Sequence, residues 1–373
     1  MSKPKIIAFY LPQYHPIEEN NKWFGEGFTE WTNVGKAKPL FKGHYQPKVP
    51  ADLGYYDLRI PDVRNAQAKL AKEAGIDAFC YYHYWFGNGR VIMEKPLEMV
   101  VDTGEPDFPF CLCWANHSFY KKNWNNDTKI LDQTLLIKQE YPGEEDIKEH
   151  FNYILKIIKD PRYYKIDGRL VFVIYDFLSM GKEYFQKMKK IWNDLADKNK
   201  LPKFYFIGYT YNDKLIEQNI FIDFDQVIFT PTNNVFLNGD YSQRNQKLIK
   251  VKKLFGQILH YNFQIKDYKK VLPKLIHEIE KKENVIPILL PNWDTTPRRG
   301  FGASILKNST PEMFSLHIQD VLRIVKNKKN PIIFIKSWNE WGEGNYMEPD
   351  LKFGKGYLKT LLESLVHHEN SDK

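Results

Sequence analysis

Two glutamates three residues apart, Glu340 and Glu343, are the residues of this chain best suited to chemistry. They follow the apolar run 331–335, so we expect them where a buried strand emerges into a loop. Two carboxylates held together beside Trp338 and Trp341 cannot both ionise freely, because poor solvation and mutual repulsion raise the proton affinity of at least one. The pair therefore predicts acid/base catalysis at neutral pH. The alternative is that Glu340 caps a helix and Glu343 is solvated.

The composition is that of a globular protein and narrows the class of partner. Aromatic residues make up 15% of the 373 residues, which suits a surface that lies flat against sugar rings and equally suits a large core. The formal net charge is +8, but the lysines are scattered, and their densest run, Lys247 to Lys253, has apolar residues interleaved. We therefore expect a solvated helix face there and no nucleic-acid partner. The charge also allows a weak attraction to acidic glycans or phospholipid head groups.

The N-terminus and the cysteines bear on location and on metals. No signal-peptide hydrophobic region stands at the N-terminus and no apolar run is long enough to span a bilayer, so we expect no transmembrane segment and a cytoplasmic protein. Cys80, Cys111 and Cys113 fall in predicted buried strands, and their odd number favours reduced thiols. No Cys/His pair stands at metal-binding spacing. We expect these thiols to pack in the core, with no metal and no cofactor.

Short apolar runs recur along the chain, each followed by a polar or aromatic segment and then by a helix-like pattern. Continuous hydrophobic strands are typical of a parallel sheet covered on both faces. The intervening segments carry apolar residues at helical spacing, as between Tyr184 and Leu195. The alternation predicts an α/β fold: a single (β/α)8 TIM barrel, with residues 1–373 as one catalytic domain and long βα loops forming the active-site cleft. The eight predicted strands are Ile6–Tyr10, Ile76–Tyr81, Phe110–Trp114, Leu170–Tyr175, Phe204–Tyr209, Gln226–Phe229, Ile286–Leu290 and Ile332–Ile335.

A barrel of this kind places its chemistry at the C-terminal ends of the strands. The segments after the predicted strands mix aromatic with hydrogen-bonding side chains, which matches a carbohydrate cleft. Each residue also has an ordinary explanation: a structural histidine, a core tryptophan, or a loop-holding pair such as Asp294 with Arg298. Their co-location favours substrate binding. We predict substrate contacts from Tyr14, Trp31, His44, His83, Trp85, Trp114, Asn116, His117, Tyr175, Tyr209, Trp293, Asp294, Arg298, Trp338 and Glu348, the last with a surface-loop role as the alternative.

Several motifs spread over nearly the whole chain carry a family resemblance. They are Phe9–His15, Gly27–Asn33, His44–Pro47, Tyr81–Trp85, Trp114–Asn116, Trp293–Asp294, Thr296–Arg299 and Trp338–Gly344. In combination they resemble the WbsX-type family, associated with bacterial O-antigen and capsule clusters. That family in turn resembles the family-ninety-nine glycoside hydrolases, the endo-α-mannosidases. The resemblance implies a (β/α)8 barrel and a glycan-processing role.

For the mannosidases, the acidic pair of the Asn-Glu-Trp-x-Glu-Gly motif is understood to act without an enzyme nucleophile. Carried over, the resemblance implies that Glu340 is the base that draws the proton from the sugar 2-hydroxyl, which then attacks the anomeric carbon to give an anhydro-sugar. Glu343 would protonate the leaving oxygen and then activate water, with retention of configuration. The usual rule that links carboxylate separation to stereochemistry does not apply to such a mechanism.

Two other functions remain open alongside hydrolysis. WbsX-type proteins have commonly been named glycosyltransferases. Asp223-Phe-Asp225 matches the Asp-x-Asp pattern of a site that binds a metal and a nucleotide-sugar, but it introduces a predicted strand. No phosphate-binding glycine motif follows any predicted strand. We therefore favour hydrolysis, or transglycosylation by the same carboxylates, over nucleotide-sugar transfer. The third reading is a catalytically inactive glycan-binding barrel, against which the presence of both glutamates argues.

The expected partner is a glycan, an oligosaccharide or polysaccharide that is either free or lipid-linked. The mechanism implied by the resemblance requires an α-linked, mannose-like residue with a free 2-hydroxyl. The sugar, its linkage, endo or exo action and the oligomeric state are not readable from the sequence.

Overall fold

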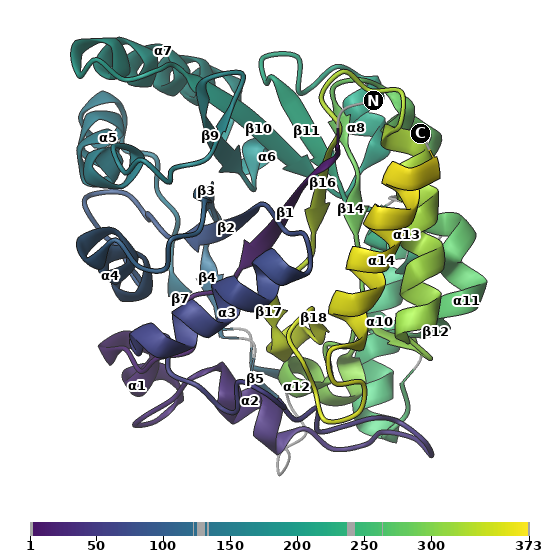
Figure 1. Cartoon of the computed structure of the whole chain (residues 1–373). Coiled ribbons are helices and arrows are strands. Elements are labelled where there is room, and N and C mark those ends of the chain that lie inside the picture. The colour runs from purple at the N-terminus through teal and green to yellow at the C-terminus, as the bar shows by residue number, and fades with distance from the viewer. Residues whose placement is uncertain are drawn as a thin grey trace.

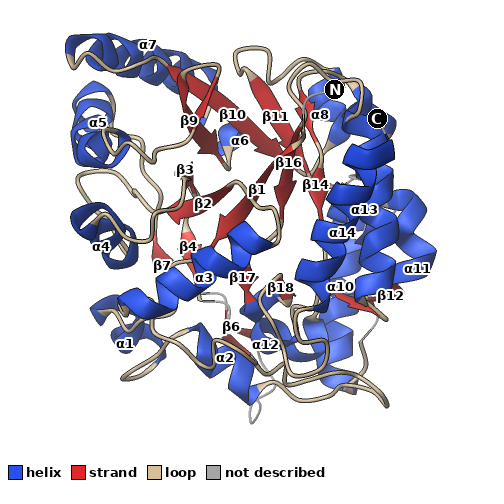
Figure 2. Cartoon of the chain, in the orientation of Figure 1, coloured by secondary structure: helices blue, strands red, loops and turns tan. Residues whose placement is uncertain are grey.

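A ring of parallel strands forms the centre of the molecule (Figures 1 and 2). The computed structural model describes residues 3–121, 123–124, 131–132, 134–236, 243–262 and 264–371. The strands of the ring are β1 (Lys5–Tyr10), β2 (Ala78–His83), β3 (Phe110–Trp114), β9 (Arg169–Ile174), β10 (Phe204–Thr210), β11 (Gln226–Phe229), β13 (Val285–Ile286), β14 (Ile288–Leu289) and β16 (Ile332–Ile335). Their hydrogen-bonded order is β13, β11, β10, β9, β3, β2, β1, β16, β14, and all neighbours in this order run parallel.

The ring closes through the seventh predicted strand, which proline divides into two short pieces. Val285–Ile286 pairs with β11, and Ile288–Leu289 pairs with β16 on the other side. Pro287 between them has no backbone N–H to donate to a ladder, which is why the strand breaks there. Its carbonyl still accepts a hydrogen bond from the Phe334 N–H at 3.1 Å. The predicted (β/α)8 barrel is confirmed, with the seventh position of the ring shared by β13 and β14.

Helices connect successive strands and cover the outside of the ring (Figure 2). The longer helices are α3 (Pro61–Glu73), α4 (Lys95–Thr103), α5 (Glu144–Ile158), α7 (Lys182–Lys198), α10 (Gln243–Leu259), α13 (Pro311–Val325) and α14 (Gly356–Ser371). Their starts and stops follow local chemistry. Pro311 opens α13 after a Thr310 side chain that accepts from the Met313 N–H, and Gly75, with a φ of 83°, follows α3.

Short elements gather beyond the C-terminal ends of the strands, in the lower part of Figure 1. They come from loops far apart in the sequence, after β1, β14 and β16. These elements are α1 (Glu18–Phe24), α2 (Glu30–Lys36), α12 (Thr296–Arg299), the 3-10 helices η3 (Gly300–Gly302) and η4 (Trp341–Glu343), and the strand pair β17 (Asn339–Glu340) and β18 (Asn345–Tyr346). The long βα loops thus form one end of the barrel, as predicted.

Other short elements complete the described chain. The remaining strands are β4 (Phe119–Tyr120), β5 (Asn123–Trp124), β6 (Leu131–Asp132), β7 (Leu135–Ile137), β8 (Lys165–Ile166), β12 (Ile265–Asp267) and β15 (Ile305–Lys307). The remaining helices are α6 (Phe177–Met180), α8 (Asp213–Glu217), α9 (Thr232–Phe236), α11 (Tyr268–Val271), η1 (Leu272–Lys274) and η2 (Glu278–Lys281).

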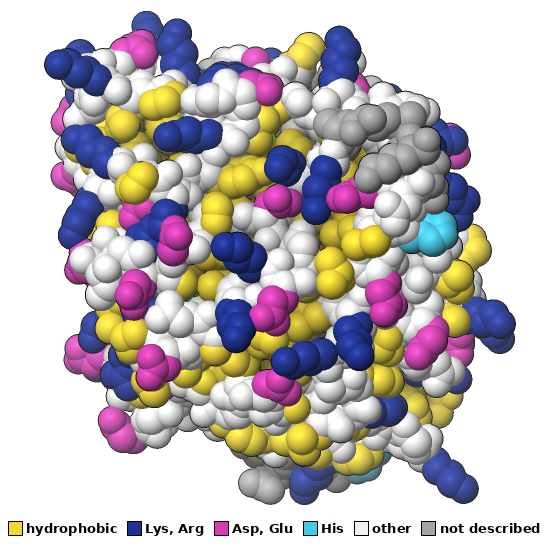
Figure 3. Space-filling model, viewed as in Figure 1, with side chains coloured by type: hydrophobic (Ala, Val, Ile, Leu, Met, Phe, Trp, Pro, Cys, Tyr) yellow, Lys and Arg dark blue, Asp and Glu magenta, His cyan; other side chains and the backbone are white. Residues whose placement is uncertain are grey.

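The three cysteines and the charged surface residues lie where the sequence predicts them. Cys80, Cys111 and Cys113 are free and buried in β2 and β3. On the face shown in Figure 3, basic and acidic side chains are interspersed rather than segregated. Among the described residues, no helix is both long enough and apolar enough to cross a bilayer.

Candidate active site

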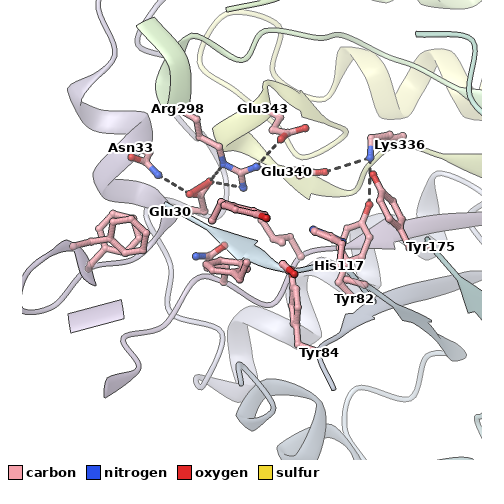
Figure 4. Close-up of a pocket in the computed structure, with 18 residues that line it drawn as sticks. Glu30, Asn33, Tyr82, Tyr84, His117, Tyr175, Arg298, Lys336, Glu340 and Glu343 are labelled. Carbon is pink, nitrogen blue, oxygen red and sulfur yellow. Dashed lines mark hydrogen bonds and ion pairs between the residues drawn. The ribbon is translucent and has the colours of Figure 1, made fainter. Parts of the chain in front are cut away.

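A pocket opens at the C-terminal end of the barrel, and both predicted catalytic glutamates line it (Figure 4). About 870 Å³ of space, part of it open to solvent, is free of protein atoms there. The lining residues are Leu11, Gln13, Phe24, Phe28, Glu30, Asn33, Tyr82, Tyr84, Ala115, His117, Ser118, Phe119, Tyr120, Tyr175, Arg298, Lys336, Glu340 and Glu343.

Glu340 and Glu343 both contact one nitrogen of the same arginine. Arg298 Nη1 lies 2.8 Å from Glu343 Oε1 and 3.5 Å from Glu340 Oε1. The side chain of Glu340 is 8% exposed and that of Glu343 16%, so Glu340 sits deeper. Ser337 Oγ donates to Glu340 Oε2 at 3.2 Å. The two carboxylates therefore face one cavity, as the sequence predicts.

The loop that carries the pair is fixed to the first strand by an asparagine. Asn339 Nδ2 donates to the Leu11 carbonyl at 3.0 Å, and its Oδ1 accepts from the Leu11 N–H at 2.7 Å. The Tyr14 hydroxyl donates to the Asn339 carbonyl and accepts from the Trp341 N–H. These buried bonds fix the residues on both sides of Glu340 in a single position.

Two glycines let neighbouring groups approach this loop closely. Gly344 has a φ of 58°, and a Cβ built on it would lie 2.7 Å from the Asp294 carbonyl oxygen. Gly342 has no positive φ, but a Cβ there would overlap the Glu30 carboxylate and lie 2.9 Å from Arg298 Nε. Glycine at position 342 thus provides the room in which Glu30 and Arg298 meet.

Arg298 is held in turn by a third glutamate, from α2. Glu30 Oε2 lies 2.8 Å from both Nε and Nη2 of Arg298, and Asn33 Nδ2 donates to Glu30 Oε1 at 2.7 Å (Figure 4). Asp294 orients the short helix that carries Arg298, because its Oδ1 accepts from the Thr296 N–H at the start of α12. The guanidinium is therefore positioned before any substrate arrives.

A buried lysine lies on the other side of Glu340. Lys336 Nζ is 3.9 Å from Glu340 Oε2 and 3.3 Å from the Tyr82 hydroxyl oxygen, and the side chain is 3% exposed. Its ammonium lies within 6.0 Å of the ring centroids of Phe9, Tyr82, Tyr175, Tyr209 and Trp293. Aromatic faces stabilise a cation that water does not reach. Lys336 thus sits at the base of the pocket, where the strands end.

The electrostatics of the pocket raise the proton affinity of Glu340. Burial raises the pKa of Glu340, and the neighbouring Glu343 carboxylate raises it further, while Lys336 and Arg298 oppose the increase. Three carboxylates and two cations line the pocket, so the cluster carries one negative charge when every group is ionised. Unlike surroundings that separate the proton affinities of two nearby carboxyl groups allow them to divide acid and base roles.

Comparison with known proteins places the chain in a family. A model described as "Glycosyltransferase WbsX" matches residues 6–361. The chain belongs to the WbsX family. Two curated relatives, each called "Uncharacterized protein WxcX" and from two strains of Xanthomonas campestris pv. campestris, are 31% and 30% identical over 97% of this chain. The chain spans about half the length of these relatives, 49% of each.

Solved structures similar to this WbsX-family chain share its fold. The GH99 endo-alpha-mannosidase from Bacteroides thetaiotaomicron, in complex with Bis-Tris-propane, superimposes with a TM-score of 0.58 at 14% identity, over 99% of this chain and 98% of that one. A second structure, named "Glycoside hydrolase-like protein", gives a TM-score of 0.59 at 14% identity, over 98% and 94% of the two chains. The WbsX family and the (β/α)8 barrel predicted from the motifs are thereby confirmed.

Three more residues of the predicted site lie in or beside the pocket. His117 and Tyr175 line it and also line an adjoining hollow, to which Tyr209 contributes. Tyr209 stacks on Tyr175 with ring centroids 4.5 Å apart. The shared residues show that the hollow lies beside the main pocket.

Four of the predicted residues lie behind this wall instead. His83 Nε2 is 2.8 Å from His150 Nε2, Trp85 stacks on His150, and Trp114 Nε1 donates to the Trp85 carbonyl. Side chains alternate along a strand, so Tyr82 points into the pocket while His83 points toward α5. Asn116 binds the Tyr141 hydroxyl and the Asp176 carbonyl. All four are buried outside the pocket lining.

Tyr14, Trp31 and Trp338, also predicted to bind substrate, lie behind the loop that carries Glu340 and Glu343. Tyr14, Trp31 and Trp341 form a ring cluster, with Trp31 5.5 Å from Trp341, while Trp338 is fully buried and lies 5.2 Å from Phe79.

His44, Trp293 and Asp294, also predicted to bind substrate, lie near the segment that carries Arg298. His44 Nε2 lies 2.7 Å from Asp294 Oδ2, behind α12. Trp293 borders Lys336.

Glu348 is a buried carboxyl group outside the pocket lining. It accepts hydrogen bonds from Tyr56, Gln67 and Trp341, and burial raises its pKa to about 7. It neither lies on a surface loop nor faces the cavity. Its contact with Trp341 Nε1 at 2.6 Å anchors the loop between Glu340 and Glu343.

The sequence-based site omits Glu30 and Lys336. Glu30 lies in the Gly27–Asn33 motif, but its partner Arg298 is 268 residues away and no spacing reveals the pair. Lys336 follows directly after β16, and a lysine at the end of an apolar strand in a catalytic-face loop is the signal that was available.

The Asp223–Asp225 pair stands apart from the pocket. Asp225 precedes β11, where it accepts from Arg169 Nη1 and the Phe206 N–H, and Asp223 accepts from Gln186 Nε2. These contacts lie at the N-terminal ends of the strands, whereas the pocket is at the C-terminal ends. Within the described residues no three His, Cys, Asp or Glu side chains are grouped as a metal site would require.

Proposed function

We propose that this chain is a carbohydrate-active enzyme, a retaining glycoside hydrolase that cleaves an α-linked, mannose-like residue of a bacterial oligosaccharide or polysaccharide. The observation that carries the proposal is the contact of Glu340 and Glu343 with one arginine in an aromatic-walled pocket. Deep, poorly solvated carboxylates with an unbalanced charge suit acid/base chemistry. Aromatic walls from Tyr84, Phe119 and Tyr175 suit the apolar faces of sugar rings.

In the first step Glu340 acts as base and Glu343 as acid. Glu340 accepts the proton of the sugar 2-hydroxyl, whose oxygen bonds to the anomeric carbon as the bond to the leaving oxygen breaks. Glu343 delivers its proton to that leaving oxygen. The raised pKa of Glu340 makes it a stronger base than an ordinary carboxylate, and Lys336 at 3.9 Å stabilises its ionised form until the proton is taken.

In the second step the roles reverse and water enters. Glu343, now ionised, accepts a proton from water, whose oxygen bonds to the anomeric carbon. The bond from that carbon to the 2-oxygen breaks, and Glu340 returns the proton to it. Two inversions at the anomeric carbon give net retention. An acceptor hydroxyl in place of water would make the same steps a transglycosylation.

The proposal differs from the name of the family, which describes a glycosyltransferase. Nucleotide-sugar transfer usually requires groups that hold the diphosphate. In this chain the candidate Asp223-Phe-Asp225 lies at the opposite end of the barrel from the pocket, bound to Arg169 and Gln186. The charged groups of the pocket include three carboxylates, which would repel a diphosphate.

The test is product analysis on defined glycans. α-Mannosides and bacterial repeat-unit oligosaccharides are incubated with the wild-type chain and with Glu343→Gln, and products are identified by mass spectrometry. The proposal expects release of reducing sugar without any nucleotide, and its loss in the variant. Consumption of a nucleotide-sugar would show instead that the chain is a glycosyltransferase. Binding of glycans without any turnover would show instead that it is a glycan-binding protein.

A further inference from the structure

The helix α10 exposes an apolar face to solvent. Six of its aliphatic and aromatic side chains are between 47% and 64% exposed, and Tyr261, just beyond the helix, is 59% exposed. An ordinary surface helix buries its apolar stripe against the core. The six exposed apolar residues of α10 are Leu248, Val251, Leu254, Phe255, Ile258 and Leu259.

The side of α10 that faces the protein has the opposite character. Gly256 is buried there, against η3, and Lys253 Nζ is 3.3 Å from the Ser304 hydroxyl oxygen. Ile249 is half-buried. The helix is thus attached by a glycine and a lysine, while most of its large apolar residues point outward. The exposed apolar residues of α10 form one continuous face, whereas exposed hydrophobic residues on a protein surface are normally single and scattered.

Basic residues flank the exposed apolar face. Lys250 and Lys252 are exposed, and at 100° per residue they fall on its two borders, while Arg244 and Lys247 are exposed near the start of the helix. No Asp or Glu occurs between residues 243 and 262. An apolar stripe bordered by lysines is the pattern of helices that lie in the plane of a membrane interface, with the stripe among the acyl chains and the lysines at the head groups.

We propose that the exposed face of α10 binds the surface of an anionic phospholipid bilayer. The apolar residues insert at the level of the acyl boundary, and Lys247, Lys250 and Lys252 contact lipid phosphates. Lysine borders without any acidic residue favour an anionic lipid surface over a protein partner, which would need a matching acidic groove. This inference goes beyond the proposed carbohydrate chemistry and does not depend on it.

The position of α10 connects this surface to the pocket. The helix packs on η3, and η3 follows directly after α12, which carries Arg298. Ring contact between His260 and Phe301, at 5.3 Å, adds to this packing. A chain bound to a bilayer through α10 would hold its pocket close to the lipid head groups, where a lipid-linked glycan is presented.

Vesicle flotation tests the proposal directly. The 373-residue chain is mixed with vesicles of phosphatidylcholine alone or of phosphatidylcholine with phosphatidylglycerol. We expect binding to the mixed vesicles that weakens as salt is raised. The triple variant Lys247→Glu/Lys250→Glu/Lys252→Glu should bind about a hundredfold more weakly, because each lysine near an anionic surface contributes about 1 kcal/mol. Leu254→Ser/Phe255→Ser/Ile258→Ser should bind at least about tenfold more weakly.

A charge-matched control separates the helix from the net charge. Lys190→Glu/Lys198→Glu/Lys359→Glu changes the charge equally at exposed sites on α7 and α14 and should bind like the wild type. Circular dichroism checks that all variants are folded. The proposal is overturned if the wild type does not bind the mixed vesicles, if the control loses as much binding as the α10 variant, or if light scattering shows instead a dimer that the serine variant dissolves. Cleavage of a soluble glycan, measured in parallel, reports separately on the proposed enzyme.

Discussion

Replacing Gly342 by alanine tests whether stability and turnover depend on the close contact of Glu30 and Arg298 with the loop that carries Glu340 and Glu343. Gly342 has no positive φ, so alanine imposes no backbone strain, and any effect comes from the added methyl group. That methyl would overlap the Glu30 carboxylate and lie 2.9 Å from Arg298 Nε. Glu30 must move by about 1 Å or more, because carbon and oxygen atoms do not pack closer than roughly 3 Å. The 2.8 Å contacts between Glu30 and Arg298 cannot survive this shift.

The magnitude follows from the burial of the pair. The Glu30 side chain is 2% exposed and that of Arg298 14%, and breaking a buried ion pair costs about 3–5 kcal/mol. Displacing Arg298 from Glu343 by about 1 Å should lower turnover roughly a hundredfold. Urea unfolding and product formation measure the two effects. Gly35→Ala is the matched control, because Gly35 lies in α2 with no atom within 4 Å of its added Cβ, and it should gain up to about 1 kcal/mol. Equal stability and equal turnover of Gly342→Ala and the wild type would refute this account of the cluster.

Three further predictions concern the same groups. Glu343→Gln should lower turnover by roughly 10²–10⁴ while the unfolding curve stays unchanged, and an equally active variant would remove Glu343 from the mechanism. The acid limb of the pH–rate profile should lie above the range of an ordinary glutamate, because catalysis needs ionised Glu340 and burial raises the pKa of that group. Lys336→Met removes a cation that opposes this increase, so the acid limb of the variant should move to higher pH. An acid limb that stays in place or moves to lower pH in the variant would contradict this prediction. Glu348 has its pKa raised from 4.5 to about 7 in the folded chain, so the folded state holds the extra proton and stability is lost as pH rises through that window. The unfolding free energy of the wild type relative to Glu348→Gln should therefore fall by roughly 3 kcal/mol between pH 4.5 and 7, and a pH-independent difference would show that Glu348 titrates normally.

The fold was predictable because each barrel strand is a short apolar run. Ile6–Tyr10 and Ile332–Ile335 need no long-range information to be recognised as buried strands, and the order of a (β/α)8 barrel then follows from their succession. The break at Pro287 could also have been foreseen, since proline cannot donate within a central strand.

The site was predictable only in part, because position at a strand end does not fix the direction of a side chain. Glu340, Glu343, Arg298, His117 and Tyr175 all line the pocket. Counting alternate residues back from the end of β2 would have separated inward-facing Tyr82 from outward-facing His83, but the register of the count depends on where the strand ends.

Residues coupled over long range were beyond the reach of motif reading. Glu30 and Lys336 contact partners far away in the sequence, Arg298 in α12 and Tyr82 in β2 respectively, and only the folded barrel brings these groups together.

The central claim is that Glu340 and Glu343 together break a glycosidic bond with water as the final acceptor. Incubation of bacterial repeat-unit glycans in water enriched in heavy oxygen, followed by mass spectrometry, tests it most directly. The wild-type chain should place one heavy oxygen on the anomeric carbon of the released sugar, without added nucleotide, while Glu340→Gln and Glu343→Gln leave the glycan intact. Cleavage that continues in both folded variants, or sugar transfer that requires a nucleotide donor and incorporates no heavy oxygen, would contradict the claim.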